Sequence, residues 1–458
     1  MKVILFLTLA LSGGWTEPIE IAEGSNSDLV LDRNGVCWCN PSSWFLYSFN
    51  NETSTWQFEI EAPSPGTPLF DSDGTLWMFN GFTYIRWDGQ VWSEVETVPA
   101  YPSANFNTNI TADSSDGIWV GWETDWWGAQ QVVYNRYLNG TWGDPGPVSD
   151  TLISTDDKDI RSMTTDAEGR VWFVWRNIWD PEYDDGDVLK AKYNDDGVWS
   201  EESVLYVHDY EQDTIFPLCP HLAPDRDGGV WAVWCGHDAG SIFMYYIQVQ
   251  YWDGESWSEL ETIAEAGVFD IFGNPEVRIA VDNLGYVWVV WRQALVPRDA
   301  YCDIYYSVNT GEGWSEPAPI DDDPGADGDP EIVVDYMGRV WCVWGSTRGG
   351  EAGTWASYYW STGVEEPAPV TPATHLPVLT VERSLGSSFT FHVSNPAKST
   401  EIQIYDAAGR NVRNLEINTD VLTWDGTDNI DEMLSAGVYF VRIDGTRTNA
   451  SERIVLIR

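Results

Sequence analysis

The stretch Pro330-Glu-Ile-Val-Val-Asp335-Tyr-Met-Gly338-Arg-Val-Trp341-Cys-Val-Trp344 decides the fold of this chain. It joins an apolar run to a second run, rich in Val and Trp, through a turn that starts at Asp335. Gly338 suits this turn because glycine accepts a positive φ angle without steric strain. Large apolar side chains on both faces of the second run are typical of a strand buried on both sides. The stretch therefore predicts a β-hairpin within a layered, all-β core.

The same pattern, an Asp with Gly three residues later and Trp six residues later, occurs seven times. The copies lie 39 to 59 residues apart and start at Asp32, Asp71, Asp113, Asp166, Asp225, Asp282 and Asp335, with the Gly of the third copy displaced by one. Each hairpin is followed by a third strand, such as Asp303–Ser307, and by a fourth marked Gly-Trp-Ser-Glu-Pro, as at residues 313–317. Seven four-stranded units predict an all-β, seven-bladed β-propeller over residues 13–362. A linear solenoid is the alternative, although its repeats are usually shorter.

A copy of the fourth strand stands before the first repeat. Gly14-Trp-Thr-Glu-Pro18 matches Gly313-Trp-Ser-Glu-Pro317 almost residue for residue. A fourth strand that precedes the first blade can complete only the last blade, which would close the ring and leave no open edge. Val364-Glu-Glu-Pro367 is a rival for that edge, but it lacks the Trp.

The composition indicates a folded, acidic and exported protein. Asp and Glu number 72 against 24 Lys and Arg, a formal net charge of −48 at pH 7. Such a surface repels phosphate, so nucleic acid and anionic membranes are poor partners. The apolar run Val3–Leu11 after Lys2 predicts a signal peptide over residues 1–12, with a buried N-terminal strand as the alternative. No other stretch provides the roughly 20 apolar residues that a transmembrane helix needs.

The repeat order resembles that of the sialidase-like propellers. In that family the turn between the third and fourth strands carries the Asp box, Ser-x-Asp-x-Gly-x-Thr-Trp, and Ser307-Val-Asn-Thr-Gly-Glu-Gly-Trp314 is a degenerate form of it. The resemblance covers residues 15–362 and implies the propeller fold. Sialidases have six blades, an Arg-Ile-Pro signature, an arginine triad and a Tyr nucleophile. Here Arg278-Ile279 continues into Ala280, so no catalytic residue is carried over.

The C-terminal part has a different composition. Residues 363–380 contain four Pro and read as a stiff linker, and residues 381–458 alternate short apolar runs with turn residues, the pattern of a small Ig-like β-sandwich. This module resembles the C-terminal sorting domain of type IX secretion and the Ig-like domain of the flagellar hook-cap scaffold. The matching residues are Asn395-Pro396, Ile402–Asp406, Gly409-Arg410, Gly437-Val-Tyr439 and Arg453–Arg458. The resemblance implies secretion machinery as a partner and a location outside a bacterium or on its outer surface. An accessory sandwich without a sorting role is the alternative.

A polar ring is the sharpest functional signal. The residue four before each repeat Asp is polar in every copy: Asp28, Thr67, Asn109, Ser162, His221, Arg278 and Glu331. These residues start the inner strands, near the mouth of the channel where the long loops of a propeller gather. The loops add aromatic and basic residues, notably Trp126, Trp127, Arg176 and Arg292, which suit sugars or a peptide. We therefore expect a binding site built from Asp28, Asn109, His221, Arg278, Glu331, Trp126, Trp127, Arg176 and Arg292. The alternatives are strand starts that are simply solvated and rings that cover blade edges.

Motifs for catalysis and cofactors are scarce. The sequence has no Gly-x-Ser-x-Gly, His-Glu-x-x-His or phosphate-binding loop. Asp321–Asp329 and the group Asp156, Asp157 and Asp159 offer oxygen ligands for Ca²⁺, but neither has EF-hand spacing and a solvated loop explains both. We expect no catalytic residue and no cofactor, and a non-catalytic propeller that binds an extracellular glycan or protein. A sialidase-like glycoside hydrolase is the alternative.

The cysteines allow one pairing. Cys219 lies six residues before Asp225, which places it across the hairpin from Trp234, next to Cys235. Adjacent cross-strand positions bring Cα atoms near the 4.4–6.8 Å or so that a disulfide requires. We predict a disulfide between Cys219 and Cys235. Two buried thiols are the alternative.

Overall fold

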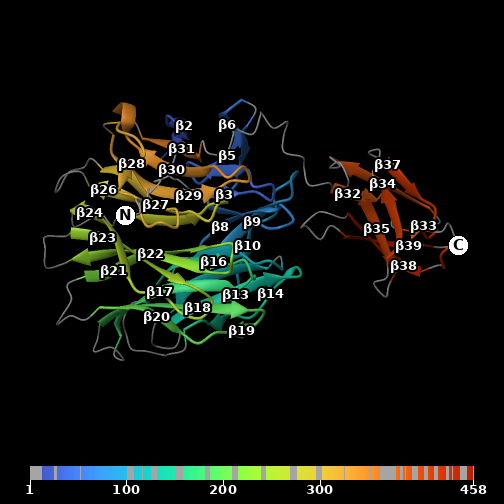
Figure 1. Cartoon of the computed structure of the whole chain (residues 1–458), viewed down its shortest axis with the longest axis horizontal. Helices are drawn as coiled ribbons and strands as arrows, with labels where there is room; N and C mark the ends of the chain where they lie inside the picture. Colours follow the sequence, from blue (N-terminus) through green and yellow to red (C-terminus); the bar gives the residue numbers. More distant parts are fainter. Residues whose placement is uncertain are drawn as a thin grey trace, which may run out of the picture. The chain divides into compact units, whose positions relative to one another are not determined.

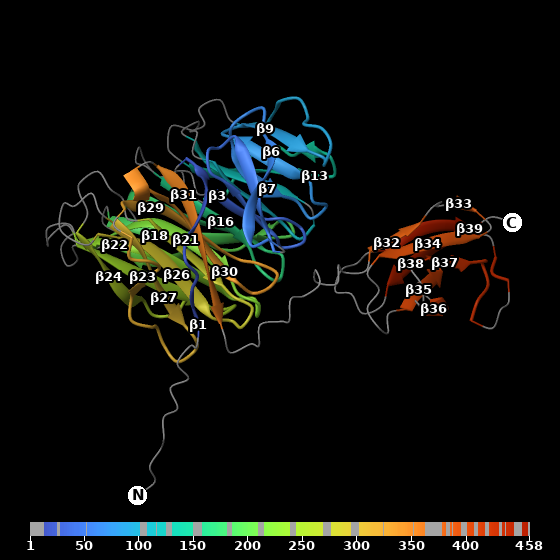
Figure 2. The ribbon, with the colours of Figure 1, turned by 90° about the horizontal axis from the view of Figure 1, so that it is seen from above.

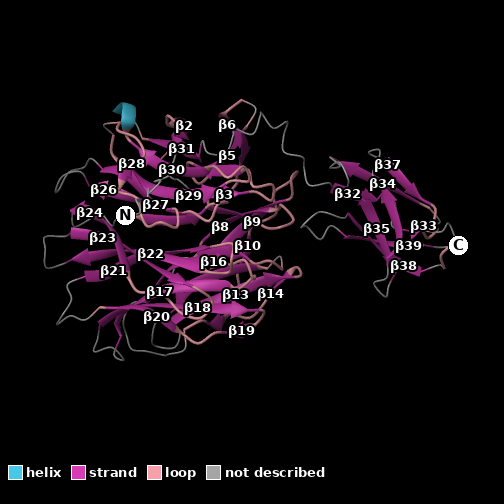
Figure 3. Ribbon diagram, viewed as in Figure 1, coloured by secondary structure: helices cyan, strands magenta, loops and turns pink. Residues whose placement is uncertain are grey.

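The computed structural model carries a propeller unit and a C-terminal unit (Figure 1). It describes residues 13–24, 28–51, 53–100, 108–115, 117–124, 131–149, 158–180, 186–208, 215–238, 244–268, 276–294, 302–323, 325–350, 352–361, 378–381, 385–386, 388–394, 401–406, 411–416, 421–429, 433–435, 437–443 and 451–456. Most of the described residues lie in strands, joined by turns and loops, with one short 3-10 turn at Arg348–Gly350 (Figure 3). No helix among the described residues is long and apolar enough to cross a membrane.

The first unit is a seven-bladed β-propeller, as predicted. Each blade is an antiparallel sheet whose strands follow one another from the inner edge outward. Blade 1 consists of β3 (Asp28–Leu31), β4 (Cys37–Asn40), β5 (Phe45–Asn50) and β6 (Thr55–Glu61). Blade 2 consists of β7 (Thr67–Phe70), β8 (Leu76–Asn80), β9 (Thr83–Trp87) and β10 (Glu96–Thr97). Blade 3 consists of β11 (Asn109–Ala112), β12 (Ile118–Thr124), β13 (Gln131–Leu138), β14 (Thr141–Trp142) and β15 (Gly146–Pro147).

The remaining blades have longer strands. Blade 4 consists of β16 (Lys158–Thr165), β17 (Val171–Asp180), β18 (Gly186–Asp195), β19 (Val198–Trp199) and β20 (Ser203–Val207). Blade 5 consists of β21 (Ile215–Pro224), β22 (Val230–Asp238), β23 (Met244–Trp252) and β24 (Glu261–Val268). Blade 6 consists of β25 (Val277–Val281), β26 (Val287–Ala294), β27 (Cys302–Asn309) and β28 (Ala318–Pro319). Blade 7 consists of β29 (Asp327–Val334), β30 (Val340–Ser346) and β31 (Gly353–Ser361), with β1 (Gly13–Trp15) and β2 (Ile19–Glu23) added at its outer edge.

The ring is closed in the way that the copied motif predicts. In β1, Gly13 pairs with Ser361 and Trp15 with Tyr359, so the N-terminal strand completes blade 7 (Figure 2). The inner strands β3, β7, β11, β16, β21, β25 and β29 lie side by side in that order, and β29 lies next to β3 again. The rival segment Val364–Pro367 lies outside the described residues.

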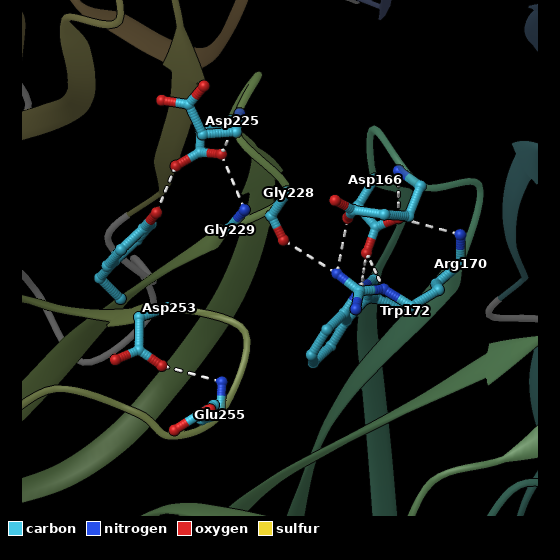
Figure 4. Close-up of polar contacts among 11 residues, drawn as sticks. Asp166, Arg170, Trp172, Asp225, Gly228, Gly229, Asp253 and Glu255 are labelled. Atoms are coloured by element: carbon cyan, nitrogen blue, oxygen red, sulfur yellow. Dashed lines mark hydrogen bonds and ion pairs between the residues drawn. The ribbon is translucent and has the colours of Figure 1, made fainter.

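The repeat Asp explains why the pattern recurs. At Asp166, Oδ1 accepts the backbone N–H groups of Glu168 and Arg170, at 3.1 and 2.9 Å, which fixes the turn. Oδ2 accepts the indole N–H of Trp172 at 2.6 Å. The indole bond recurs in six blades, at 2.6 to 3.3 Å. One carboxylate thus orders the turn and orients a large core side chain (Figure 4).

The C-terminal unit spans Thr362–Arg458 and has a core of its own. One sheet holds β32 (Val378–Val381), β34 (Phe389–Ser394) and β37 (Val421–Trp424). The other holds β33 (Leu385–Gly386), β39 (Ser451–Leu456), β38 (Gly437–Ile443), β35 (Glu401–Asp406) and β36 (Asn411–Glu416). Side chains from both sheets, including Phe391, Ile404 and Trp424, share one core, so the unit is a β-sandwich. The strand β32 begins within residues 363–380, the stretch predicted to be a linker.

Candidate functional site at the channel mouth

The polar ring residues lie on the inner strands, and several of them meet. Arg278 of β25 donates from Nε to Oε1 of Glu331 on β29 at 2.6 Å. Its Nη1 lies 2.9 Å from Nε2 of His221 on β21. Blades 5, 6 and 7 are therefore linked at the mouth by a His–Arg–Glu chain. Ser162 contributes differently, because its Oγ accepts the backbone N–H of Leu222 at 3.3 Å between blades 4 and 5.

The other half of the ring surrounds a cavity. Ring residues from four successive blades line it: Glu331 of blade 7, Asp28 of blade 1, Thr67 of blade 2 and Asn109 of blade 3. Thr108 adds a further hydroxyl, and the cavity measures about 240 Å³. The mouth thus has a closed side, where Arg278 is already engaged, and an open side lined by carboxylate, hydroxyl and amide groups.

Charge and burial act together on the ring. Burial raises the pKa of the Glu331 carboxyl, and the bonded Arg278 offsets this only in part. Burial lowers the pKa of the Arg278 guanidinium, but the charges of Glu331 and Glu276 outweigh this and the net pKa is raised. Arg278 therefore stays charged and is held by its carboxylate partner. Their side chains are only 22% and 28% exposed, so the pair is a fixed part of the wall.

A second tier of charged residues, which the sequence analysis missed, lies next to the ring. Glu276 immediately precedes β25, and its Oε2 accepts the backbone N–H of Asp329 at 2.6 Å. Burial, and then the neighbouring Asp329, raise the pKa of Glu276 to about 7, although Arg292 lowers it somewhat. Glu276 and Asp329 each precede a ring residue by two positions. Their contact joins residues 53 positions apart on blades 6 and 7, so no local sequence pattern marks it.

Two strained bulges shape this tier. The pairing of β21 with β22 shifts between Leu218 and His221, and that of β29 with β30 shifts between Gly328 and Glu331. Cys219 and Asp329 lie in these bulges with φ angles of 51° and 52°. Left-handed backbone at a non-glycine residue persists only where its surroundings impose it, and it is enriched at binding sites.

The predicted loop residues have different positions. Arg292 of β26 joins the second tier: its backbone N–H donates to the Glu276 carbonyl at 3.1 Å. Arg176 of β17 forms an ion pair with the buried Asp187 of β18, so it is held within blade 4. Trp126 and Trp127 lie outside the described residues, as do Asp156 and Asp157.

The acidic stretch near Asp321 surrounds an arginine. Arg348 donates from Nη2 to Asp321 at 2.8 Å and to Asp327 at 3.3 Å. Within the described ranges, no group of three or more His, Cys, Asp or Glu side chains is arranged to hold a metal ion. A cationic side chain therefore takes the place that a bound cation would have among these carboxylates.

The two cysteines of blade 5 lie close to the predicted arrangement. Leu218 pairs with Cys235, and Cys219 follows in the bulge. The structure has both side chains as thiols, and burial raises the pKa of Cys235 well above its usual value. The disulfide stays a prediction, which mass spectrometry of non-reduced peptides would test.

One family model matches part of the C-terminal unit. Residues 380–449 match the family model of the FlgD Ig-like domain. No curated protein matches the chain. An oligogalacturonate lyase in complex with manganese is 13% identical over 76% of this chain and 98% of its own, with a TM-score of 0.49. The polysaccharide lyase Uly1 is 10% identical over 73% of this chain and 89% of its own, with a TM-score of 0.48.

Sialidases are also among the structural neighbours. The Trypanosoma rangeli sialidase in complex with the inhibitor DANA is 9% identical over 96% of this chain and 88% of its own, with a TM-score of 0.41. These are likenesses of fold only. The protein is a seven-bladed β-propeller followed by a β-sandwich that matches the FlgD Ig-like family model over residues 380–449.

Proposed function

We propose that this protein is a secreted or cell-surface propeller that binds a neutral glycan at its channel mouth without transforming it. The observation that carries the proposal is the cavity of about 240 Å³ lined by Asp28, Thr67, Asn109 and Glu331. Four blades each supply one residue of the polar ring to it, and Thr108 adds a further hydroxyl. Drug-sized ligands occupy pockets of roughly 300–1,000 Å³, so this cavity fits one unit of a polymer rather than a whole ligand.

The chemistry of the cavity favours hydroxyl groups. Carboxylate and amide oxygens accept hydrogen bonds from sugar hydroxyls, and the Thr hydroxyls can donate or accept. An acidic sugar would meet Asp28 and Glu331, and the described residues that line the cavity include no Lys or Arg. The adjacent Arg278 is bound to Glu331 and His221. This argues against sialic acid and uronic acid units. A protein segment that presents hydroxyl or amide groups is the second ligand class that fits.

One observation favours a second candidate function, glycoside hydrolysis. Glu276, with its pKa raised to about 7, could donate a proton at neutral pH while a nearby carboxylate stays charged. The arginine triad of sialidases has no counterpart at Arg278, whose described partners are Glu331, His221 and the Val277 carbonyl. Hydrolysis of a bound glycan that is lost in Glu276→Gln would establish this alternative.

The export part of the proposal rests on both ends of the chain. Residues 1–12 have the composition of a signal peptide, and the C-terminal Ig-like unit carries the residues that resemble a type IX sorting domain. We propose that this unit directs the propeller to the cell surface or the medium.

A glycan array tests the binding proposal. We expect the wild-type chain to bind neutral glycans and Asp28→Asn to weaken that binding by about tenfold, the size of one charged hydrogen bond. Asp88→Asn is the matched control, since it removes the same charge from an exposed turn of blade 2. Arg278→Ala should also weaken binding, because it releases the Glu331 wall. Absence of any glycan ligand would redirect the search to protein partners, and a preference for acidic glycans would contradict the proposal.

A further inference from the structure

A second site emerges from comparing the blades with one another. In blade 4, Arg170 follows the repeat Asp by four residues and donates from Nε to Asp166 at 2.6 Å. Its guanidinium lies 5.8 Å from the ring of Trp172 and 5.1 Å from that of Tyr193. It then continues into the next blade, where Nη2 donates to the Gly228 carbonyl at 2.9 Å (Figure 4).

Blade 7 repeats this arrangement. Arg339 donates from Nε to Asp335 at 2.6 Å. Its guanidinium lies 5.1 Å from the ring of Trp341 and 5.2 Å from that of Tyr358. It too reaches the neighbouring blade, where Nη2 donates to Oδ1 of Asn51 at 2.6 Å. Asp, Arg, Trp and Tyr thus form one recurring unit that spans two blades.

Blade 5 has the same unit without its arginine. Asp225, Trp231 and Tyr251 take the corresponding positions, with Trp231 paired to Tyr251 across the strands, but Gly229 stands where the arginine would be. The Tyr251 hydroxyl instead donates to Oδ2 of Asp225 at 2.6 Å. Trp231 forms no indole hydrogen bond to any described residue, although the other six repeat Trp residues bond to their Asp.

A cavity of about 410 Å³ lies where that arginine would reach. Asp225, Asp227, Trp231 and Tyr251 of blade 5 line it, together with Asn283 and Asn309 of blade 6. Gly285 and Gly311 leave it open, because a Cβ atom added to either would meet nothing within 4 Å. Gly285 corresponds in blade 6 to Gly228, whose carbonyl accepts Arg170. Two carboxylates line the cavity against one cation, Arg226, which is hydrogen-bonded to Asn283.

We propose that this cavity binds a guanidinium group supplied from outside the chain, in the position that Arg170 and Arg339 fill from within in their own blades. The group stacks on Trp231, pairs with Asp225 and donates to acceptors of blade 6. Guanidinium suits such a place because it is planar, weakly hydrated and always charged. Its sources are free arginine or an arginine side chain of a peptide. The site lies at the turn end of the inner strands, whereas the channel mouth lies where these strands start.

Calorimetric titration of the full chain tests this inference. We expect free arginine or N-acetyl-arginine amide to bind, and citrulline, which is neutral but of the same shape, to bind at least about tenfold more weakly. Tighter binding of the blocked amide would identify a peptide as the source, and binding of free arginine alone would identify the amino acid. Equal binding of arginine and citrulline, or no binding of either arginine probe, would overturn the proposal.

Two variants locate the site. Gly229→Arg should fill the cavity from within and abolish binding, provided that the Tyr251 ring shifts, because its hydroxyl would lie 2.0 Å from the added Cβ atom. Thr75→Arg is its control: it adds the same charge at the same repeat position of blade 2. If Gly229→Arg shows no thermal unfolding transition, Asp225→Asn takes its place as the test variant. It removes the charge of the site, but its amide oxygen can still accept the backbone hydrogen bonds of the turn, so the chain should fold. If a folded Gly229→Arg or Asp225→Asn variant binds arginine as tightly as the wild type, the assignment of the site is refuted.

Discussion

At the scale of single residues, the repeat Asp of a blade accepts hydrogen bonds from several groups at once. In blades 4 and 7 the repeat Asp holds its turn, an indole and a guanidinium, whereas in blade 5 it holds its turn and a Tyr hydroxyl. The Asp166 side chain is fully buried and Arg170 is only 14% exposed. Removal of Asp166 would therefore take away the buried partner of Arg170 and leave it only the half-exposed Glu168 as a carboxylate partner. Removal of Asp225 leaves no such charge behind.

This difference predicts unequal effects of the same substitution. We expect Asp166→Ala to lower the free energy of unfolding by about 3 kcal/mol, as loss of one partner of a buried ion pair does. Asp225→Ala should lower it by about 1–2 kcal/mol, the size of lost neutral hydrogen bonds. Thermal unfolding of both variants measures the difference. Equal losses would mean that the guanidinium adds nothing to the blade.

The raised pKa of Glu276 makes the stability of the propeller depend on pH. Its pKa is raised from 4.5 to about 7, mainly by burial. Between these values the folded chain keeps a proton that the unfolded chain has released, so stability falls as the pH rises through this window. Glu276→Gln cannot titrate. The Glu276→Gln variant should therefore show a weaker dependence of stability on pH. At about pH 8 its free energy of unfolding should exceed that of the wild type by on the order of 1–2 kcal/mol.

Thermal unfolding from about pH 4 to pH 8 checks this prediction. Glu312→Gln, on an exposed turn of blade 6, is the control, and its curve should follow the wild type. A Glu276→Gln curve parallel to that of the wild type would show that Glu276 does not titrate in this window.

At the scale of elements, the closing strand copies the outer strand of other blades down to its hydrogen bonds. In blade 6 the Ser315 amide donates to the Val308 carbonyl at 2.9 Å, and its Oγ accepts the Val308 N–H at 3.1 Å. Thr16 makes the same two bonds with Tyr358, at 3.0 and 3.2 Å. A hydroxyl after Trp is therefore the local requirement of this strand, and Ser and Thr both satisfy it.

The closing strand should matter more than its length suggests. Trp15 packs edge-on against Trp288, Tyr306 and Tyr359, with ring centroids 5.4 to 6.1 Å apart. We expect Trp15→Ala to lower the free energy of unfolding by about 3 kcal/mol and to make blade 7 sensitive to protease, because its edge is then free to open. Trp314→Ala removes the same motif residue from blade 6, whose outer strand is continuous with the blade. Protease cleavage at the same rate in both variants would contradict this prediction.

The same scale explains what the sequence could predict. The repeat could be recognised in the sequence because its hydrogen bonds are local. The bond from Asp to Trp spans six residues, and the bonds within the turn span two to four. The bulges at Cys219 and Asp329 and the Glu276 tier were not predicted. They depend on contacts between blades, such as Arg278 to Glu331 and Asp329 to Glu276, which join residues 53 positions apart. The polar ring was found because it is in register with the repeat, but its partners were not.

At the scale of the whole molecule, the chain divides into two compact units at Ser361 and Thr362. The propeller closes with its own N-terminal strands, because β1 and β2 pair with β31 at the outer edge of its last blade. The C-terminal sandwich likewise has its own core of Phe391, Ile404 and Trp424. Each unit therefore has a buried core of its own, the physical requirement for folding alone.

This independence makes the export proposal testable. A chain that ends at Ser361 should keep the thermal transition of the propeller, because its closing strand and all seven blades remain. In a bacterium with a type IX secretion system, we expect the full chain on the cell surface or in the medium and the shortened chain in the periplasm. Fractionation followed by detection of the propeller measures this. The preserved transition excludes misfolding as the cause of retention, so equal export of both chains would assign the sandwich a role other than sorting.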